Sequence, residues 1–287
     1  MVRRGALTSA LLLVAACMLG AQPARIVSTA PSITEVLYAL GLGSRVVGVT
    51  TFCRYPPDAL TKPKVGTYLE PDLEVIASLR PELVIIQNNP VHLGDRLKAL
   101  KLRVLEVNYE TPAAVYSTIR SIGGAAGVPE RAAALVDRLQ REIDAMRART
   151  AKLPRRRVMF VIGRTPETLG GLVVVGSAPY LNELMEAAGG VNVFAGARAP
   201  YPNVTLEEVL ARNPEAIIDM GDMAAAGDAT AQHKKAVVAL WDRYPGLAAV
   251  KGGRVFAVAS DIFVVPGPRI VEAARSFAHM LHPEAGF

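Results

Sequence analysis

The sequence predicts an α/β protein built from two Rossmann-like lobes that are joined by one long α-helix. Three observations support this fold class. Apolar strand-like runs alternate with helical runs through most of the 287 residues, a rhythm typical of sheets flanked by helices. A helix–strand unit in residues 65–87 has a counterpart in residues 205–219. An uninterrupted helical stretch, residues 129–153, lies between these two units.

The repeated unit consists of a helix cap, a short helix, a proline and a buried strand. Asp72 and Thr205 stand at the positions of helix N-caps. Pro81 and Pro214 stop the helices, because proline disfavours helical geometry in the residue before it. The apolar run after each proline predicts a strand. Four of the ten paired positions from helix start to strand start are identical, which indicates two similar lobes, although α/β composition alone can produce such a likeness.

The first lobe alternates strand and helix from its start, which favours a mostly parallel sheet. Ser32 and Glu35 form an S-x-x-E pattern, which predicts a capping box with the helix beginning at Ile33. Gly41 is the expected end of that helix. Strands are expected at residues 25–28, 45–49, 83–86 and 103–107.

Residues 129–153 contain no internal glycine or proline, and apolar residues recur on one helical face at Leu135, Leu139, Ile143 and Met146. This pattern predicts a rigid connecting helix, or alternatively a long helix packed wholly on one lobe. We therefore expect an N-terminal α/β lobe in residues 25–127, the connecting helix in residues 128–153 and a C-terminal α/β lobe in residues 154–287. In the last of these, residues 220–232 are rich in small residues and predict a flexible loop.

The N-terminus has the pattern of a secretory signal, which we place at residues 1–24. Arg3 and Arg4 precede an apolar run too short to span a bilayer. Residues 14–17, VAAC, resemble a bacterial lipobox, in which Cys17 would become the lipid anchor of the mature protein. The alternative is ordinary cleavage near residue 21 or 24. Either route predicts a location in the periplasm or on the outer face of the cytoplasmic membrane, and we expect the lipid-anchored form.

Composition excludes several classes of function. The net charge is +6, but basic and aromatic residues do not interleave as they do on nucleic-acid surfaces, so no nucleic-acid partner is expected. With Cys17 processed, Cys53 has no partner for a disulfide and is expected to be a small loop residue. The chain lacks a phosphate-binding loop, a zinc-protease motif and a nucleophile elbow. We therefore expect no enzyme activity and no metal or cofactor of the protein's own.

Histidines are few and widely spaced. His279 and His282 could share a metal at helical spacing, but without nearby cysteine or carboxylate ligands a solvated helix end is the better prediction. His92 follows the strand at residues 83–86, at the carboxyl end where α/β folds bind ligands. It could contact the metal of a bound ligand or lie on a surface helix, and both readings stay open.

Aromatic residues give the main positive signal. Phe52, Tyr68, Tyr201 and Phe263 fall in loops that are expected to line the carboxyl edges of strands. Loop aromatics without neighbouring charges suit a large, flat, partly apolar ligand held by stacking. Taken together they predict a ligand cleft between the lobes, although simple packing explains any one of them equally well.

Two glutamates occupy equivalent positions in the two repeated units. Glu74 and Glu207 each lie in the first turn of their helix, where a carboxylate complements the helix dipole. Helix stabilisation is sufficient to explain either one. Their matched placement also suits contacts from both lobes to basic groups on a symmetric partner.

The chain resembles the helical-backbone substrate-binding proteins of ABC importers, and within that family the cobalamin-binding members. Five segments carry the resemblance and cover nearly the whole mature chain: RIVSTAPSITEVLYALG, VVGVTTFCRYPPDA, VGTYLEPDLEVIASLRPELVI, APYPNVTLEEVLARNPEAI and SDIFVVPGPRI. The resemblance implies two Rossmann-like lobes, a long connecting helix and a ligand held between the lobes.

The resemblance also implies roles for individual residues. Glu74 and Glu207 fall on the glutamates with which the family docks on arginines of the membrane permease. Phe52, Tyr68 and Tyr201 stand at pocket positions that hold other aromatic residues in the cobalamin-binding members. The pocket phenylalanine is retained as Phe263, whereas Gln87 and Ile262 replace pocket tryptophans.

The resemblance implies a monomeric extracytoplasmic protein that captures cobalamin or a related corrinoid and delivers it to an ABC permease and its ATPase. Cobalt would be part of the transported ligand. Haem and ferric-siderophore binders share the scaffold, so they remain the alternative.

Overall fold

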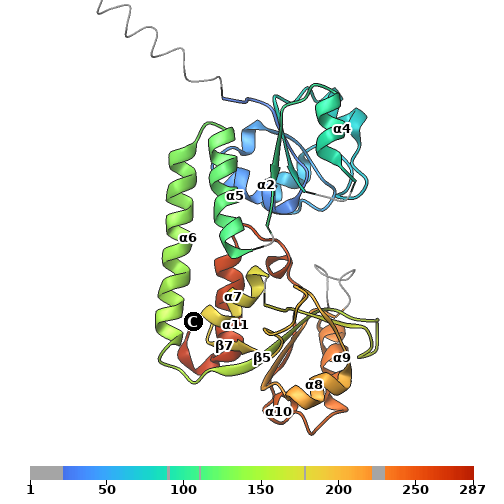
Figure 1. Ribbon diagram of the computed structural model, residues 1–287, viewed down its shortest axis with the longest axis vertical. Coiled ribbons are helices and arrows are strands. Elements are labelled where there is room, and N and C mark those ends of the chain that lie inside the picture. The colour runs from blue at the N-terminus through green and yellow to red at the C-terminus, as the bar shows by residue number, and fades with distance from the viewer. Residues whose placement is uncertain (1–21, 89–90, 110, 178, 222–229) are drawn as a thin grey trace, which may run out of the picture. The chain divides into compact units, whose positions relative to one another are not determined.

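The computed structural model describes residues 22–287, apart from residues 89–90, 110, 178 and 222–229 (Figure 1). The predicted signal segment and Cys17 lie outside the described residues, as does most of the predicted flexible loop. Contacts divide the described chain into two compact units. Unit 1 comprises the residues up to Val107 together with Arg120–Ala133, and unit 2 comprises Asn108–Ile119 and Ala134–Phe287.

Unit 1 is built on a four-stranded sheet in the order β2-β1-β3-β4, in which every pairing is parallel, as predicted. Its strands are β1 (Ile26–Ser28), β2 (Val46–Val49), β3 (Leu83–Gln87) and β4 (Val104–Val107), and its helices are α2 (Pro31–Ala39), α3 (Leu73–Ser78) and α4 (Leu93–Ala99). Helices α3 and α4 cover one face of the sheet through buried aliphatic residues such as Ile76, Val84 and Leu97. Helix α2 buries Ile33, Val36 and Leu37.

Helix α2 begins two residues before the predicted start. Its N-cap is Ala30 and Pro31 occupies the first turn, where the missing proline N–H is not needed. Ser32 and Glu35 therefore lie inside the helix and are buried, and no side-chain cap bond forms. The predicted capping box is wrong because the proline determines the helix start.

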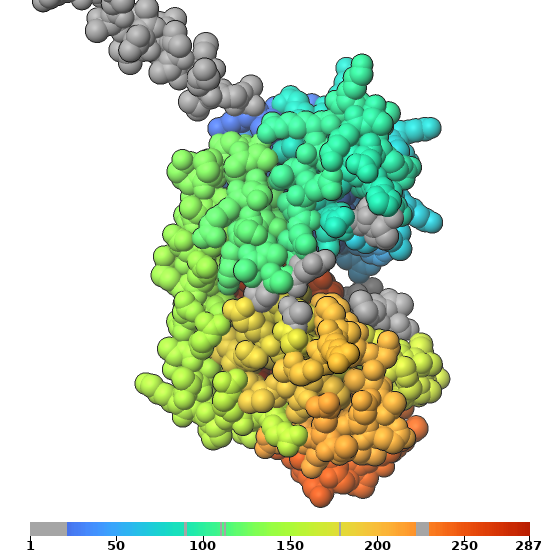
Figure 2. All heavy atoms as spheres, in the orientation of Figure 1, coloured from blue at the N-terminus to red at the C-terminus, as the bar shows by residue number. Residues whose placement is uncertain are grey.

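Helices α5 (Pro112–Ala125) and α6 (Pro129–Thr150) each contribute residues to both units. Helix α6 spans about 33 Å at about 1.5 Å per residue. Leu135, Leu139, Ile143 and Met146 are buried along one face, as the periodicity predicts. Ala132, Val136 and Thr150 are buried as well, whereas most of the other side chains of α6 are exposed on the surface (Figure 2).

Unit 2 is built on a mixed sheet in the order β10-β9-β5-β6-β8, with β7 also pairing β5. Strands β10, β9, β5 and β7 are parallel, whereas β6 is antiparallel to both β5 and β8. The strands are β5 (Arg156–Gly163), β6 (Leu172–Val174), β7 (Gly190–Asn192), β8 (Asn203–Val204), β9 (Ala216–Asp219) and β10 (Val255–Ala257). The helices are α7 (Tyr180–Ala187), α8 (Leu206–Arg212), α9 (Ala231–Asp242), α10 (Ala248–Lys251) and α11 (Ile270–Leu281).

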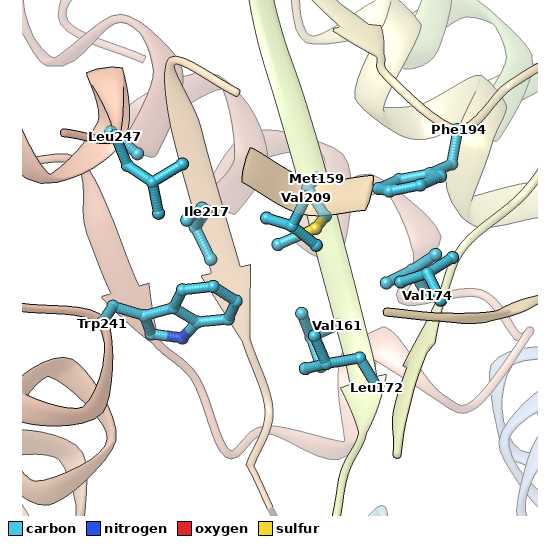
Figure 3. Packing of buried hydrophobic residues seen from close by; sticks show 11 residues of the cluster. Met159, Val161, Leu172, Val174, Phe194, Val209, Ile217, Trp241 and Leu247 are labelled. Atoms are coloured by element: carbon cyan, nitrogen blue, oxygen red, sulfur yellow. The ribbon is translucent and has the colours of Figure 1, made fainter. Parts of the chain in front are cut away.

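Alternate side chains of β5 enter two different cores. On one face Met159 and Val161 join Trp241 and Phe194 in a cluster beneath α8, α9 and α10 (Figure 3). On the other face Phe160 packs edge-on against Phe263 and Phe277, with ring centroids 5.7 and 5.6 Å apart. This alternation follows from the two-residue period of a strand that is buried on both sides.

The two repeated units fold alike at their caps. The Asp72 carboxylate accepts from the Val75 N–H at 2.9 Å, and Thr205 forms a full capping box with Glu208. Helices α3 and α8 end before the prolines, and β3 and β9 follow. The predicted caps, stops and strands are confirmed, because all of these signals act within a few residues.

The prediction of a solvated helix end is wrong for His282. Its side chain is fully buried, with Nδ1 3.6 Å from a Glu284 carboxylate oxygen. Gly189 makes room for the ring, since a Cβ at that position would lie 2.6 Å from Nε2. Arg149 donates to the Gly286 carbonyl and Arg156 lies 3.5 Å from a Glu284 carboxylate oxygen, so both contact the turn that follows the histidine.

We expect Thr205→Ala to lower the free energy of unfolding of unit 2 by about 1 kcal/mol, because it removes one of the two capping-box bonds. Thr205→Ser keeps the hydroxyl and serves as the matched control. Trp241 is the single tryptophan of the chain and lies buried in unit 2. Its fluorescence during urea unfolding therefore reports this unit, and equal stability of the two variants would contradict the assigned cap.

Candidate functional site

Three of the predicted site residues gather at the carboxyl edge of the unit 1 sheet. Phe52 follows β2, Gln87 ends β3, and Tyr68 lies in the loop before α3. The Thr51 N–H donates to the Gly66 carbonyl at 3.0 Å, which joins the loop of Phe52 to that of Tyr68. The Tyr68 hydroxyl donates to the Asn88 carbonyl at 2.7 Å, beside Gln87.

These residues differ in how they are held. Phe52 is 57% exposed, whereas Tyr68 and Gln87 are half-buried. Partial burial raises the pKa of the Tyr68 phenol, so the hydroxyl remains a hydrogen-bond donor at neutral pH. An exposed aromatic ring and an anchored one, carried on two joined loops, both offer apolar surface to a ligand.

Cys53 and His92 lie near this edge in different settings. Cys53 is fully buried, and its sulfur lies 3.1 Å from the hydroxyls of both Thr34 and Thr50. Burial raises the pKa of the thiol, so it is a structural residue and not a reactive one. His92 is exposed and precedes α4 as its N-cap in a left-handed conformation. It lines a small recess with Asn88 and Glu106.

In unit 2 the structure separates the two predicted aromatic residues. Tyr201 is 42% exposed and precedes β8, between prolines whose carbonyls accept from Val174 and Gly176. This position is beside the antiparallel edge of the sheet and does not follow the carboxyl end of a parallel strand, as we had expected. The antiparallel pairing of β6 and β8 is the reason, because it reverses the chain direction at this edge.

Phe263 is only 2% exposed, and its ring packs in the phenylalanine cluster. The turn that carries it is held by Arg269, which binds both carboxylate oxygens of Asp261 at 3.0 Å. Phe263 also lines a hollow of about 730 Å³ beside β10, an edge strand of the unit 2 sheet. The other lining residues include Lys234, Ile262, Glu272, Arg275 and His279.

A buried charge network that the sequence reading missed lies at the carboxyl ends of β5 and β9. The Asp219 carboxylate is fully buried and accepts from Arg164 Nε at 3.2 Å, Trp241 Nε1 at 2.7 Å and the Gly221 N–H at 2.5 Å. The Arg164 side chain is 2% exposed and also donates to the Thr168 carbonyl at 3.1 Å. The sequence does carry one signal of this network. Asp219 stands at the end of an apolar strand, and a carboxylate buried there needs a hydrogen-bonding partner.

Glu74 and Glu207 are both exposed in the first turns of α3 and α8. The pKa of Glu207 is held below its usual value, first by its own backbone N–H and then by the Thr205 hydroxyl. Because a lowered pKa keeps the carboxylate charged as the pH falls through the usual glutamate range, Glu207 presents a lasting negative charge at the surface.

Within the described residues, no cluster of three or more histidine, cysteine, aspartate or glutamate side chains is arranged to hold a metal ion. The same residues include no helix with the length and hydropathy needed to cross a membrane.

The chain matches a known protein family over most of its length. The family model described as periplasmic binding protein matches residues 26–262. A vitamin B12-binding protein of Salmonella typhimurium is 31% identical over 274 residues, which are 95% of this chain and 95% of that protein. An uncharacterized ABC transporter substrate-binding lipoprotein of Bacillus subtilis is 30% identical over 271 residues, or 92% of this chain and 81% of that one.

A solved structure agrees with the sequence relatives. The periplasmic heme-binding protein of Roseiflexus sp. RS-1, in its apo form, superimposes with a TM-score of 0.75 at 26% identity. The match covers 91% of this chain and 98% of that chain. Proteins named for two different tetrapyrroles are thus similar to this chain to comparable degrees.

We expect Asp219→Ala to lower the free energy of unfolding by about 3–5 kcal/mol, because it leaves the Arg164 guanidinium buried without its counter-charge. Adding Arg164→Met should recover part of that loss, since the unpaired charge is then absent. The control is Glu106→Ala, which breaks an exposed pair with Lys98 at 2.7 Å and should cost about 1 kcal/mol or less. Equal costs for the two alanine variants in urea unfolding followed by circular dichroism would contradict the network.

Proposed function

The chain belongs to the periplasmic binding protein family, and from this premise we propose that it captures cobalamin or a related corrinoid outside the cytoplasm and delivers it to an ABC importer. One observation carries the proposal: over 95% of both chains the sequence is 31% identical to a protein named for binding vitamin B12. The function is binding and delivery, and no step of covalent chemistry is part of it.

We propose that the ligand contacts Phe52, Tyr68 and Gln87 from unit 1 and Tyr201 and Phe263 from unit 2, in a cleft between two lobes joined by the long helix. The geometry of unit 1 supports this, because hydrogen bonds join the loops of its three residues at one sheet edge. An exposed ring such as Phe52 gains apolar contact when a flat macrocycle covers it. In unit 2 the support is weaker for Phe263, whose ring already packs in the protein core.

A second candidate ligand is haem or a ferric siderophore. The observation that favours it is the similarity to a heme-binding protein across 91% of this chain. Gln87 adds to it, since an amide stands where an aromatic wall is expected for a corrinoid.

We propose further that Glu74 and Glu207 contact basic residues of the permease, which works with an ATPase. Both are exposed and each opens a helix, so they present negative charge with little side-chain desolvation. The protein would act as a monomer and be held at the membrane by lipidated Cys17. The similarity to a protein named as a lipoprotein supports the anchor.

The purified mature protein should retain cyanocobalamin or dicyanocobinamide during gel filtration, seen as corrin absorbance in the protein peak. Haem is the parallel sample that tests the second ligand. Phe52→Ala should weaken binding of the retained ligand by up to about tenfold, through loss of stacking. Leu60→Ala is a matched control, because Leu60 is 56% exposed and Phe52 57%. Retention of none of the three ligands would reject the proposal.

Glu74→Ala combined with Glu207→Ala should impair ligand-dependent uptake by reconstituted permease and ATPase while leaving ligand affinity unchanged. Rim charges contribute mainly to docking and its rate, so the defect should shrink as ionic strength rises. Glu130→Ala removes another exposed first-turn glutamate, at the start of α6, and should leave uptake intact. Loss of ligand affinity in the double variant would assign the two residues to the pocket or the fold instead.

A further inference from the structure

Strand β10 leaves one edge of the unit 2 sheet open. It stands at the end of the strand order and pairs only with β9. The run VFAVA in residues 255–259 contains no charged residue and no proline, the two residue classes that commonly protect an edge strand. The strand at the opposite edge, β8, is two residues long and directly follows Pro202. The two edges of this sheet are therefore protected to different degrees.

Hydrogen bonds show which side of β10 faces its neighbour. The Ile217 N–H donates to the Arg254 carbonyl at 2.9 Å, and the Val258 N–H donates to the Asp219 carbonyl at 2.9 Å. The register pairs Phe256 with a residue of β9 between these two bonds. The backbone groups of residues 254, 256 and 258 are thus the ones directed to β9.

The backbone groups of Val255 and Ala257 point the other way, because successive residues of a strand direct their N–H and C=O groups to opposite sides. Among the described residues, none of these four groups takes part in a hydrogen bond. Both residues are only partly buried, so their free donors and acceptors are available for pairing with another strand.

The hollow of about 730 Å³ lies along this open edge. Four consecutive residues, 257–260, line one side of it. The other side is the outward face of α11, whose lining residues recur at helical spacing: Glu272, Arg275, Ser276, His279 and Met280. The volume is within the range of ligand sites. One occupant can therefore contact the free backbone groups and the helix face together.

Basic side chains outnumber acidic ones in this hollow. Lys234, Arg275 and His279 line it, and Glu272 is the single acidic residue among its lining residues. Lys234 is exposed and makes no ion pair within the described chain. Arg275 pairs with Glu142, at 3.4 Å, where both side chains are about half exposed. The charges of the hollow thus favour an acidic occupant.

We propose that this hollow binds an extended acidic segment of a partner protein, which adds to β10 as a further strand. Main-chain hydrogen bonds to Val255 and Ala257 would supply affinity, and carboxylates of the segment would meet Lys234 and Arg275. The surface goes beyond the proposed function, because it serves a protein partner and does not depend on which macrocycle is carried.

Charge disfavours a second copy of this chain as the occupant. In an antiparallel pairing centred on Phe256, Arg254 of one copy would lie opposite Val258 of the other. Val258 lines the same hollow as Lys234, so two basic residues would approach each other. Like charges placed in this way weaken an interface, whereas an acidic segment gains from the same residues.

A displayed library of random octapeptides, selected on the immobilised mature protein, tests the proposal. The recovered peptides should contain aspartate or glutamate among β-branched residues. A synthetic copy of one of them should bind about tenfold or more tightly than its counterpart with lysine at the acidic positions. At saturation it should slow hydrogen exchange of the Val255 and Ala257 amides, followed by NMR, by about tenfold or more, because these amides gain a hydrogen bond.

Ala257→Pro removes the outward N–H and leaves the bonds of β10 to β9 in place, since proline is tolerated where an edge-strand N–H faces solvent. It should weaken peptide binding by about tenfold or more. Ala257→Ser keeps the N–H and is the matched control, which should bind like the wild type. Lys234→Glu changes an exposed side chain and should reduce the preference for the acidic peptide, with circular dichroism as the check on folding for all three variants.

The proposal is overturned if no recovered peptide depends on the N–H of Ala257, if exchange of the Val255 and Ala257 amides is unchanged, or if the lysine peptide binds equally well. A wild-type dimer in sedimentation that becomes a monomer in Ala257→Pro would also overturn it, because a second copy then occupies the edge. Macrocycle retention in gel filtration is a separate measurement that Ala257→Pro should leave unchanged, so failure of either proposal is distinguishable from failure of the other.

Discussion

Parallel strand pairing is the constraint on which the arrangement of candidate site residues depends. Parallel strands end at the same edge of a sheet, so the loops after them meet whatever their own sequences are. In unit 1 all four strands obey this rule, and the loops carrying Phe52 and Tyr68 and the end of β3 are joined by hydrogen bonds at one edge. Unit 2 obeys it in part. Strands β5 and β9 bring Arg164 and Asp219 together, whereas the antiparallel pair β6 and β8 holds Tyr201 beside the sheet.

The buried pair of Asp219 and Arg164 contributes little net stability to a fold, because desolvation offsets much of its attraction. Burying a carboxylate and a guanidinium costs several kcal/mol per ion before their attraction and hydrogen bonds offset it. An apolar pair of similar volume often serves stability as well or better. Donors from the residue after β5, from α9 and from the loop after β9 offset the desolvation of Asp219. A rigid charge at a fixed place is what such a pair provides and an apolar pair does not.

Local signals in the sequence were sufficient for most of the fold. The caps at Asp72 and Thr205, the two proline stops, the apolar face of α6 and the parallel order of unit 1 all depend on residues a few positions apart, or on a rule of chain connection. The family resemblance was likewise readable from continuous segments, and the family model match confirms it.

Most of the failures share the opposite property, because they depend on residues far apart in the chain. His282 is buried beside Gly189, a residue of a much earlier segment whose missing Cβ leaves room for the ring. The position of Tyr201 depends on the direction of β6. The partner of Asp219 lies 55 residues earlier. The wrong start of α2 has a local cause. Pro31 and the S-x-x-E pattern at Ser32 both indicate a helix start, and the helix begins at the proline.

Ligand identity is decided at a still finer level than the fold. A scaffold of this kind positions a few loop side chains, and each aromatic stacking contact contributes only about 0.5–1.5 kcal/mol beyond the area it buries. Exchanging a single aromatic pocket residue for a polar one therefore changes affinity by up to about tenfold, which neither identifies nor excludes a given macrocycle. Charge discriminates more sharply, because a buried cation left without its anion retains its desolvation cost. Macrocycles that share a flat apolar body differ in the acidic groups at their periphery, so a cation fixed in a binding site discriminates among them better than a single ring does.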